Sequence, residues 1–316
     1  MSLSLAVVMD PIEQIKIHKD STFAMLLEAQ KRDWKLHYVE MNDLSQRDGR
    51  SLANAAPLKV YDDPAHWFDL GERQTTTLDQ FDVILMRKDP PFDMEYIYAT
   101  YLLEQASNTG TLVINRPSAL RNANEKLSTA WFPELCTPTL VTRDAAQLNA
   151  FILEQEDVIL KPLDGMGGAS IFRVQKDDVN RNVIIETLTS HATRFTMAQT
   201  FVPEITEGDK RILVIDGEAV PYALARIPAT GETRGNLAAG GTGVGVELGA
   251  RDWEIVKTVA PRLREQGILF AGLDVIGDYL TEINITSPTC IRELDNLYQL
   301  NIAATLFNCI EQKLAV

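Results

Sequence analysis

Short apolar runs alternate with stretches of helical spacing over the first third of this 316-residue chain. Buried strands separated by helices indicate a parallel sheet with crossover connections. The expected strands are Leu3–Met9, Leu36–Met41, Asp82–Met86 and Thr111–Ile114, and the expected helices are Ser21–Lys31 and Tyr96–Ala106. The polar stretch Ser45–Thr77 is expected to be a peripheral insertion, and its pattern predicts no particular structure.

The pattern changes near Asn122, after which predicted strands often follow one another directly. Such neighbours favour antiparallel α+β structure over a continued parallel repeat. Helices are expected over Glu125–Phe132, Ala145–Glu154, Asn182–Leu188, Trp253–Gln266 and Asp295–Gln312. Strands are expected over Pro138–Val141, Val158–Lys161, Ser170–Val174, Met197–Val202, Arg211–Ile215 and Ala219–Ala225, with a hairpin over Gly272–Ile285.

Composition restricts the classes of function. The formal net charge is −14, which disfavours nucleic acid and anionic membranes as general partners. No apolar run is long enough to span a bilayer, and the N-terminus lacks the basic start of a secretory signal. The three cysteines and four histidines show no metal-ligand spacing. We therefore expect a cytoplasmic protein without a disulfide framework or a transition-metal site.

The most informative segment is Val158–Ser170, in which Lys161 ends a predicted buried strand and a glycine-rich turn follows. Gly165, Gly167 and Gly168 would let backbone N–H groups approach a polyphosphate, while the lysine supplies a positive charge. The segment is neither a Walker A loop nor a Gly-x-Gly-x-x-Gly motif. The alternative interpretation is a hairpin turn beside an exposed lysine.

A second polar cluster lies on the predicted hairpin. Glu282 and Asn284 share one face, because side chains alternate along a strand. A three-residue turn over Gly277–Tyr279 would place Asp274 opposite Glu282. A two-residue turn would instead place Asp274 opposite Thr281. In the first register two carboxylates and an amide form an oxygen-only cluster that suits Mg²⁺, the alternative being a solvated polar face.

Basic residues recur around these segments in a strongly acidic chain. They are Lys126, Lys161, Lys210, Arg211 and Arg226. Singly each could be a surface charge, but together they fit the stabilisation of a triphosphate and an acyl phosphate. The long glycine-rich loop Ile227–Gly249 is of a length typical of lids, and its part Ile227–Thr242 is the predicted lid. The alternative is a disordered solvent loop.

These constellations together resemble the ATP-grasp fold, and within it the chain is similar to the bacterial glutathione synthetases. The segments that carry the resemblance are Met86–Asp93, Leu160–Phe172, Ala225–Gly241 and Leu280–Glu293. The resemblance implies an α/β N-terminal domain with a parallel sheet over residues 1–122. It also implies two ATP-grasp lobes of α+β structure, over residues 123–202 and 203–316, with a lid over 227–242.

The resemblance further implies a ligase that joins γ-glutamylcysteine to glycine through an acyl phosphate, while ATP is converted to ADP and phosphate. The required cation would be Mg²⁺, as two ions, with Mn²⁺ as a substitute. Family members of this type assemble as homotetramers.

Each site residue receives a role from the same resemblance. The nucleotide would be bound by Lys126, Lys161, Gly165, Gly167, Gly168, Gln199, Phe201, Val202 and Asp209. Arg211 and Arg226 would be catalytic, and Asp274, Glu282 and Asn284 would hold the metal. Substrate contacts would come from Arg87, Arg234, Asn236, Ser287, Thr289 and Arg292.

The sequence departs from the resembling pattern near the end of the lid, where Thr242 replaces an expected arginine and Gly243–Leu248 also differ. Two other functions stay open on the sequence. One is another ATP-grasp amino-acid or peptide ligase, which would differ at Arg87–Asp93 and Arg292. The other is a non-catalytic nucleotide-binding module, which would need neither the oxygen cluster nor a long lid.

Overall fold

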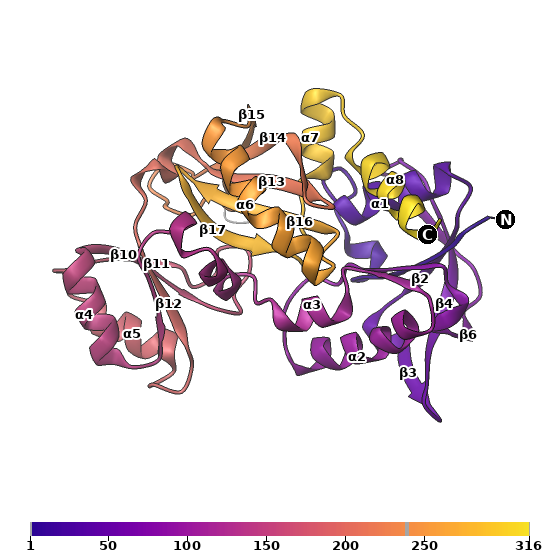
Figure 1. Ribbon diagram of the computed structural model, residues 1–316, viewed down its shortest axis with the longest axis horizontal. Coiled ribbons are helices and arrows are strands. Elements are labelled where there is room, and N and C mark those ends of the chain that lie inside the picture. The colour runs from indigo at the N-terminus through magenta and orange to yellow at the C-terminus, as the bar shows by residue number, and fades with distance from the viewer. Residues whose placement is uncertain (1, 238–239, 316) are drawn as a thin grey trace.

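The computed structural model describes residues 2–237 and 240–315. These residues form three β-sheets that lie side by side along an elongated molecule (Figure 1). The sheets take their strands from residues 4–114, 139–200 and 209–284 in turn. The expected boundaries after residues 122 and 202 therefore fall between sheets. None of the helices in the described ranges is long and apolar enough to cross a membrane.

The first sheet has a parallel centre, as the alternation of strands and helices predicted. Its central strands pair in the order β2-β1-β7-β8, and all three pairings are parallel. These strands are β1 (Ser4–Val8), β2 (Lys35–Val39), β7 (Val83–Met86) and β8 (Leu112–Ile114). The helices beside them are α1 (Ser21–Lys31), α2 (Met94–Asn108) and α3 (Pro117–Asn122).

Strand alternation decides which helix covers which face of this sheet. Leu5 and Val7 belong to the same core as the apolar side of α1, whereas Ala6 and Val8 belong to the core that contains α2. Asp20 begins α1 by accepting a hydrogen bond from the Phe23 N–H at 2.6 Å. This cap fixes the loop between β1 and α1, which reaches the site described below.

The stretch Ser45–Thr77 extends the first sheet outward with antiparallel strands. Its long strand β4 (Arg50–Val60) pairs with β2. Three shorter strands pair with β4, namely β3 (Leu44–Arg47), β5 (Phe68–Leu70) and β6 (Gln74–Thr77). The sequence predicted no structure here, because β3, β5 and β6 are short and mostly exposed and such strands give only a weak periodic signal.

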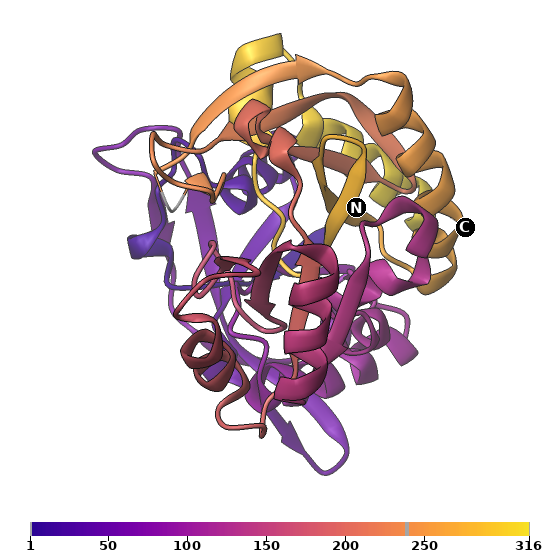
Figure 2. The same cartoon turned by 90° about the vertical axis from the view of Figure 1, so that its left-hand side faces the viewer.

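The second sheet is small and antiparallel, with the strand order β11-β10-β12-β9. Its strands are β9 (Thr139–Thr142), β10 (Asp157–Pro162), β11 (Phe172–Gln175) and β12 (Thr196–Thr200). Two helices, α4 (Ala145–Gln155) and α5 (Arg181–Thr189), pack on it and face the viewer in Figure 2. Leu148 and Ile185 from these helices meet Leu160 of β10 in a separate core.

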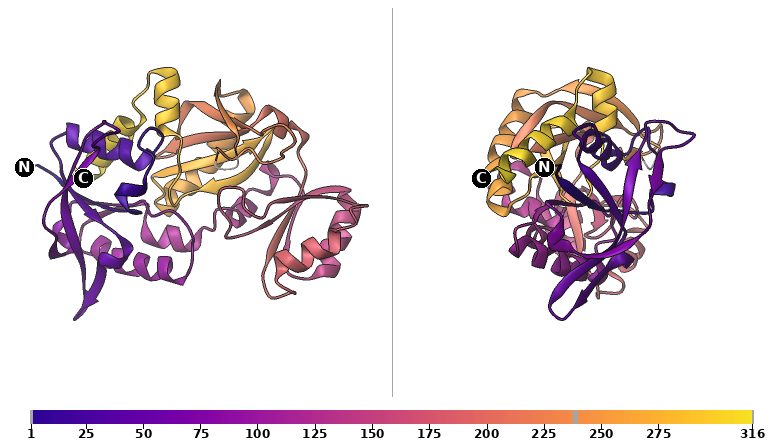
Figure 3. Two further views of the ribbon diagram at one scale, coloured as in Figure 1. Left: turned by 180° about the vertical axis from the view of Figure 1, so that it is seen from behind. Right: turned by 90° about the vertical axis from the view of Figure 1, so that its right-hand side faces the viewer.

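The third sheet is also antiparallel, with the strand order β15-β14-β13-β16-β17. Its strands are β13 (Asp209–Ile215), β14 (Glu218–Ile227), β15 (Thr242–Glu247), β16 (Phe270–Ile276) and β17 (Tyr279–Asn284). The later helices are α6 (Ala250–Gln266), α7 (Ile291–Tyr298) and α8 (Ile302–Leu314). The core on one face of the sheet includes α6, and the core on the other includes α7 and α8, which also contact α1 (Figure 3).

Three predicted elements need correction. The stretch Ile227–Gly249 is not all loop, because β15 lies within it and pairs with β14. The predicted helix Asp295–Gln312 is two helices, since Gln299 has a φ of 54°, which a continuous right-handed helix excludes. The predicted helix Glu125–Phe132 shrinks to the 3₁₀ helix Leu127–Trp131.

Candidate active site

A cavity of about 640 Å³ lies among the three sheets. Its lining comes from the glycine-rich turn after β10, from β13, β14, β16 and β17, and from the loops after β1 and β7. The predicted site residues that line it are Lys126, Lys161, Gly165, Gly167, Gly168, Gln199, Phe201, Val202, Asp209, Arg211, Arg226, Arg234, Asn236, Asp274, Glu282, Asn284, Ser287 and Thr289. Folding thus gathers residues from well-separated parts of the chain around one space.

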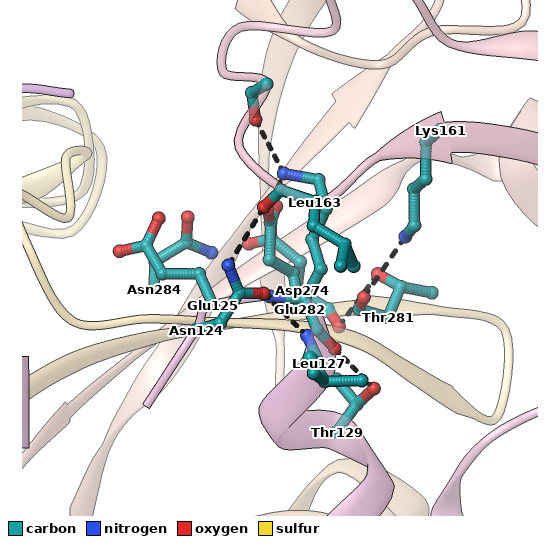
Figure 4. Close-up of polar contacts among 12 residues, drawn as sticks. Asn124, Glu125, Leu127, Thr129, Lys161, Leu163, Asp274, Thr281, Glu282 and Asn284 are labelled. Carbon is teal, nitrogen blue, oxygen red and sulfur yellow. Dashed lines mark hydrogen bonds and ion pairs between the residues drawn. The ribbon is translucent and has the colours of Figure 1, made fainter. Parts of the chain in front are cut away.

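Two lysines point into this space from different elements. Lys161, on β10, donates its Nζ to the Thr281 carbonyl of β17 at 3.3 Å (Figure 4). Lys126 donates its Nζ to the Gly165 carbonyl at 2.6 Å and contacts Glu282 Oε1 at 2.7 Å. Burial lowers the pKa of Lys161 to about 8. Although burial opposes the shift, the Glu282 carboxylate raises the pKa of Lys126.

The glycine-rich turn after β10 requires a residue without a side chain at its centre. Gly168 has a φ of +82°, and a Cβ there would lie 2.6 Å from Asn236 Oδ1. Arg234 donates its Nη1 to the Gly168 carbonyl at 3.3 Å. The loop after β14 therefore lies directly against the glycine-rich turn, and a larger residue at Gly168 would have to displace the Asn236 and Arg234 side chains.

The β16–β17 hairpin has a tighter turn than predicted. Ile276 pairs with Tyr279, so the turn holds two residues and the three-residue prediction was wrong. A bulge at Thr281 then shifts the register, and Asp274 still lies opposite Glu282. The prediction that the two carboxylates face each other is confirmed. The pairing results from a two-residue turn combined with a bulge, and the sequence analysis did not predict that bulge.

The oxygen cluster lies on one side of the cavity (Figure 4). Its possible metal ligands are the side-chain oxygens of Asp274, Glu282 and Asn284. Asn284 donates its Nδ2 to the Gly272 carbonyl at 3.2 Å, which leaves its Oδ1 available as a ligand. No group of three His, Cys, Asp or Glu side chains with metal-ligand geometry occurs in the described ranges. Two carboxylates and one amide fit a hard cation such as Mg²⁺, which completes its shell with water and phosphate oxygens.

Two arginines neutralise the innermost carboxylates. Strand pairing places Arg211 opposite Asp274, and Asp209 opposite Arg226. Asp274 Oδ2 lies 3.0 Å from Arg211 Nη2 and 2.8 Å from Arg226 Nη2. Although burial opposes the shift, these guanidinium groups hold the pKa of Asp274 well below its usual range. The cavity wall therefore carries two fixed positive charges beside an ionised carboxylate.

The wall near β12 combines apolar and polar groups. Phe201 lies under the Arg173 guanidinium, whose carbon is 3.7 Å from the ring centre. Gln199 donates its Nε2 to Thr139 Oγ1 at 3.1 Å.

Asp209, the first residue of β13, has a carboxylate oxygen that the described residues leave unsatisfied. Its Oδ1 is buried and has no hydrogen-bond partner among them. Such an oxygen is a candidate acceptor for a ligand hydroxyl.

Two predicted substrate residues lie outside the cavity lining. Arg87 is buried and donates to Thr22 Oγ1 at 3.0 Å and to the Pro288 carbonyl at 2.9 Å. Arg292 binds both oxygens of Asp62 at 2.9 Å. Arg87 thus ties the segment after β17 to the first sheet, and Arg292 ties α7 to the loop between β4 and β5.

Several cavity residues were missed by the sequence analysis. One is Glu125, which precedes Lys126 and was assigned to an ordinary helix. Others are Lys16, Lys19, Asp20 and Asp89, in the loops after β1 and β7. The rule that ligands bind beyond the carboxyl ends of parallel strands would have found this second set.

Comparison with known proteins identifies the family. A family model for the prokaryotic glutathione synthetase N-terminal domain matches residues 3–121, and one for the prokaryotic glutathione synthetase ATP-grasp domain matches residues 125–299. The chain belongs to the prokaryotic glutathione synthetase family. The family's Shewanella oneidensis glutathione synthetase is 59% identical over 312 residues, with 99% of each chain covered. The Pseudomonas putida glutathione synthetase is also 59% identical, over 314 residues and 99% of each chain.

Solved structures place this family member in the ATP-grasp fold. The ATP-grasp ligase PsnB, complexed with a minimal precursor, Mg and ADP, superposes with a TM-score of 0.63 at 15% identity, covering 99% of this chain and 98% of that one. D-alanyl-alanine synthetase A from Vibrio cholerae superposes with a TM-score of 0.62 at 14% identity, covering 100% and 99%. Together, the family assignment and the fold identify the chain as a ligase of the ATP-grasp type.

Proposed function

We propose that this chain joins γ-glutamylcysteine to glycine and converts one ATP to ADP and phosphate for each peptide bond. The observation that carries the proposal is the convergence of Lys126, Lys161, two arginines and the oxygen cluster on one cavity. The relatives at 59% identity are named as glutathione synthetases, which selects the substrates among those open to an ATP-grasp ligase.

The chemistry proceeds in two transfers. The cysteinyl carboxylate first attacks the γ-phosphorus of ATP, which gives an acyl phosphate and ADP. The glycine amine, after losing a proton, then attacks the acyl carbon, forms the C–N bond and expels phosphate. Both transfers build negative charge on oxygen, and Arg211 and Arg226 lie at the cavity wall where they would stabilise it.

Nucleotide binding would use the groups between the second and third sheets. The ammonium groups of Lys126 and Lys161, with the backbone N–H groups of the glycine-rich turn, would bind the phosphates. Gln199, Phe201 and Val202 would line the adenine slot. Asp209 would accept a ribose hydroxyl through its unbonded Oδ1.

The metal site would be formed by Asp274, Glu282 and Asn284 holding two Mg²⁺ ions, or Mn²⁺ in their place. The PsnB structure, which contains Mg and ADP, supports a magnesium nucleotide in this fold. When bound, Mg²⁺ neutralises phosphate charge and makes the γ-phosphorus more electrophilic. Glu282 would exchange part of its interaction with Lys126 for the cation.

Substrate contacts are proposed for the groups beside this centre. Arg234 and Asn236 on the loop after β14, with Ser287 and Thr289 after β17, line the cavity and could receive the carboxylates. Arg87 and Arg292 would support these segments from behind. We also propose a cytoplasmic homotetramer that binds neither nucleic acid nor membrane, on the basis of the family resemblance and the acidic charge.

The direct test is product analysis. Purified protein is incubated with ATP, MgCl₂, γ-glutamylcysteine and glycine, and the products are identified by mass spectrometry while ADP is counted. We expect glutathione and ADP in equal amounts. A parallel reaction offers glutamate as acceptor in place of glycine. The proposal would be contradicted if the chain ligated glutamate in the parallel reaction but formed no glutathione in the reaction with glycine.

A further inference from the structure

The short segment Asn124–Lys126 joins the first sheet to the second and is hydrogen-bonded on two sides. On the side of the second sheet, Asn124 donates its Nδ2 to the Leu163 carbonyl at 3.1 Å (Figure 4). Lys126 donates its Nζ to the Gly165 carbonyl, as described above. Both acceptors belong to the glycine-rich turn, so this side of the segment sets where the turn lies.

On the other side the segment extends the edge of the third sheet. The Ile283 N–H of β17 donates to the Glu125 carbonyl at 2.8 Å. One carboxylate oxygen of Glu125, Oε1, then accepts three further hydrogen bonds. The donors are the Ile285 N–H at 2.8 Å, the Thr286 N–H at 2.9 Å and the Thr286 hydroxyl at 2.8 Å. One side chain therefore fixes the two residues that directly follow Asn284.

Glu125 also lines the cavity, although no nucleotide, metal or substrate role has been given to it. Burial, and then the charge of Glu282, raises the pKa of the Glu125 carboxyl, while the three hydrogen bonds oppose the shift. A carboxylate kept in such a place needs these donors. Its neighbour Lys126 reaches the cavity from the same short segment, so any drift of the Glu125 backbone moves the Lys126 ammonium.

We propose that Glu125 is a positioning residue that locks the Lys126 segment to the end of β17, so that Lys126 and Asn284 keep their places in the lining of the nucleotide cavity. The inference rests on the proposed nucleotide site and adds a residue to it. Groups that orient a metal-ligating side chain from behind, as Glu125 would for Asn284, typically change metal affinity or activity by roughly 10- to 100-fold when they are removed.

The test compares Glu125→Ala with Glu125→Gln. The amide oxygen of glutamine has two lone pairs and can still accept hydrogen bonds from these donors, whereas alanine accepts none. We expect Glu125→Ala to weaken ADP binding in the presence of MgCl₂ by roughly tenfold or more. We expect the KM for ATP to rise in step, and Glu125→Gln to stay within about twofold of the unmodified chain because it restores the acceptor. Calorimetric titration with ADP and steady-state kinetics provide the two readouts.

Controls separate positioning from other causes. Glu134→Ala makes the same chemical change at an exposed carboxylate and should leave ADP binding unchanged. If Glu125→Ala does not fold, Thr286→Val removes one of the three donors and should weaken ADP binding roughly threefold. Unchanged ADP binding in Glu125→Ala, or in Thr286→Val, would overturn the proposal. An equal loss of ADP affinity in Glu125→Gln and Glu125→Ala would also overturn it. The negative charge of Glu125, and not its role as a hydrogen-bond acceptor, would then be what ADP binding requires.

The proposed function can fail separately from this inference. If the unmodified chain does not bind ADP with MgCl₂, the proposed nucleotide site is wrong. If it binds ADP and the alanine variant binds equally well, only the role of Glu125 is wrong.

Discussion

Lys161 holds its charge in a buried position, where its Nζ donates to a carbonyl and forms no ion pair among the described residues. Lys126, by contrast, is paired with Glu282 at 2.7 Å. This difference explains why the pKa of Lys161 falls to about 8 whereas that of Lys126 rises. The phosphates of a bound nucleotide would supply the negative charge that Lys161 lacks. In the protein without nucleotide, the Lys161 ammonium is therefore available to bind them.

Lys161 should give the free protein a specific dependence of stability on pH. The unfolded lysine has a pKa of about 10.4 and the folded one a pKa of about 8, so between these values the unfolded state holds more protons. The free energy of unfolding contributed by this group therefore rises with pH in that window, by at most about 1.4 kcal/mol per pH unit. Urea unfolding of the unmodified chain and of Lys161→Met at about pH 7.5 and about pH 10 measures it. A stability difference that does not change with pH would contradict the buried charge.

Glu282→Gln should remove most ligase activity and leave the fold intact. The amide keeps a hydrogen-bond acceptor for Lys126 but loses the negative charge that a cation requires. We expect kcat/KM for ATP to fall at least roughly 100-fold, and the free energy of unfolding to fall by about 1–3 kcal/mol. Kinetics and urea unfolding measure the two effects. A variant that retains activity would remove Glu282 from the metal site.

At the scale of elements, the loop between β14 and β15 covers the glycine-rich turn. Arg234 contacts Gly168, and Gly235 packs so closely that a Cβ would lie 2.4 Å from the Arg226 carbonyl. A covering loop is useful in the proposed reaction, because an acyl phosphate must be protected from water until the amine attacks. The predicted lid Ile227–Thr242 also includes Ala238 and Ala239, which lie outside the described residues.

Shortening this loop should uncouple ATP use from peptide formation. Ile227 and Thr242 are directly paired, so a two-residue Asn-Gly turn can replace residues 228–241. We expect the shortened chain to release ADP with much less than one peptide formed per ADP. Arg234→Ala, which removes one side chain and keeps the cover, serves as the comparison. Equal amounts of peptide and ADP from the shortened chain would show that the loop does not protect the acyl phosphate and only connects β14 to β15.

Thr242→Arg should change coupling little. Thr242 is exposed, lies at the start of β15 and does not line the cavity, whereas Arg234 of the same loop already does. The ratio of peptide to ADP, measured for Thr242→Arg and for the unmodified chain, checks this. A clear improvement would show that an arginine at the end of the loop is needed for closure.

For the whole molecule, Asn115 joins the first sheet to the third. Its Nδ2 donates to the carbonyls of Phe270 and Ile285, each at 2.7 Å, and its Oδ1 accepts from the N–H groups of Leu269 and Phe270. All four partners are buried backbone groups. This amide is therefore one of the contacts that set the position of the first sheet relative to the oxygen cluster on β16 and β17, together with the Arg87 and Arg292 contacts.

Asn115→Ala should destabilise the whole chain. Four buried backbone groups would lose their partner, so the free energy of unfolding should fall by about 3–5 kcal/mol. Urea unfolding measures this loss, and Asn122→Ala, at an exposed asparagine, is the matched control. A change below about 1 kcal/mol would mean that water replaces the side chain.

Local sequence determined most elements and the types of group at the site. Strands β1, β7 and β10, helix α1 and the glycine-rich turn were predicted within a few residues, because apolar periodicity, the glycines and the strand-end lysine are local signals. The oxygen cluster was predicted from spacing within one hairpin. Even there the turn length was wrong, since a bulge leaves no pattern in the sequence.

Only the tertiary structure decided how these groups meet. Glu125 reaches Ile285 and Thr286 across 160 and 161 positions, and Asn115 reaches Phe270 across 155. The pairing of Arg87 and Arg292 with groups outside the cavity is likewise set by distant segments. A hydrogen bond of this kind depends on how sheets pack, and packing is governed by the summed burial of many side chains. No short stretch of sequence contains that sum.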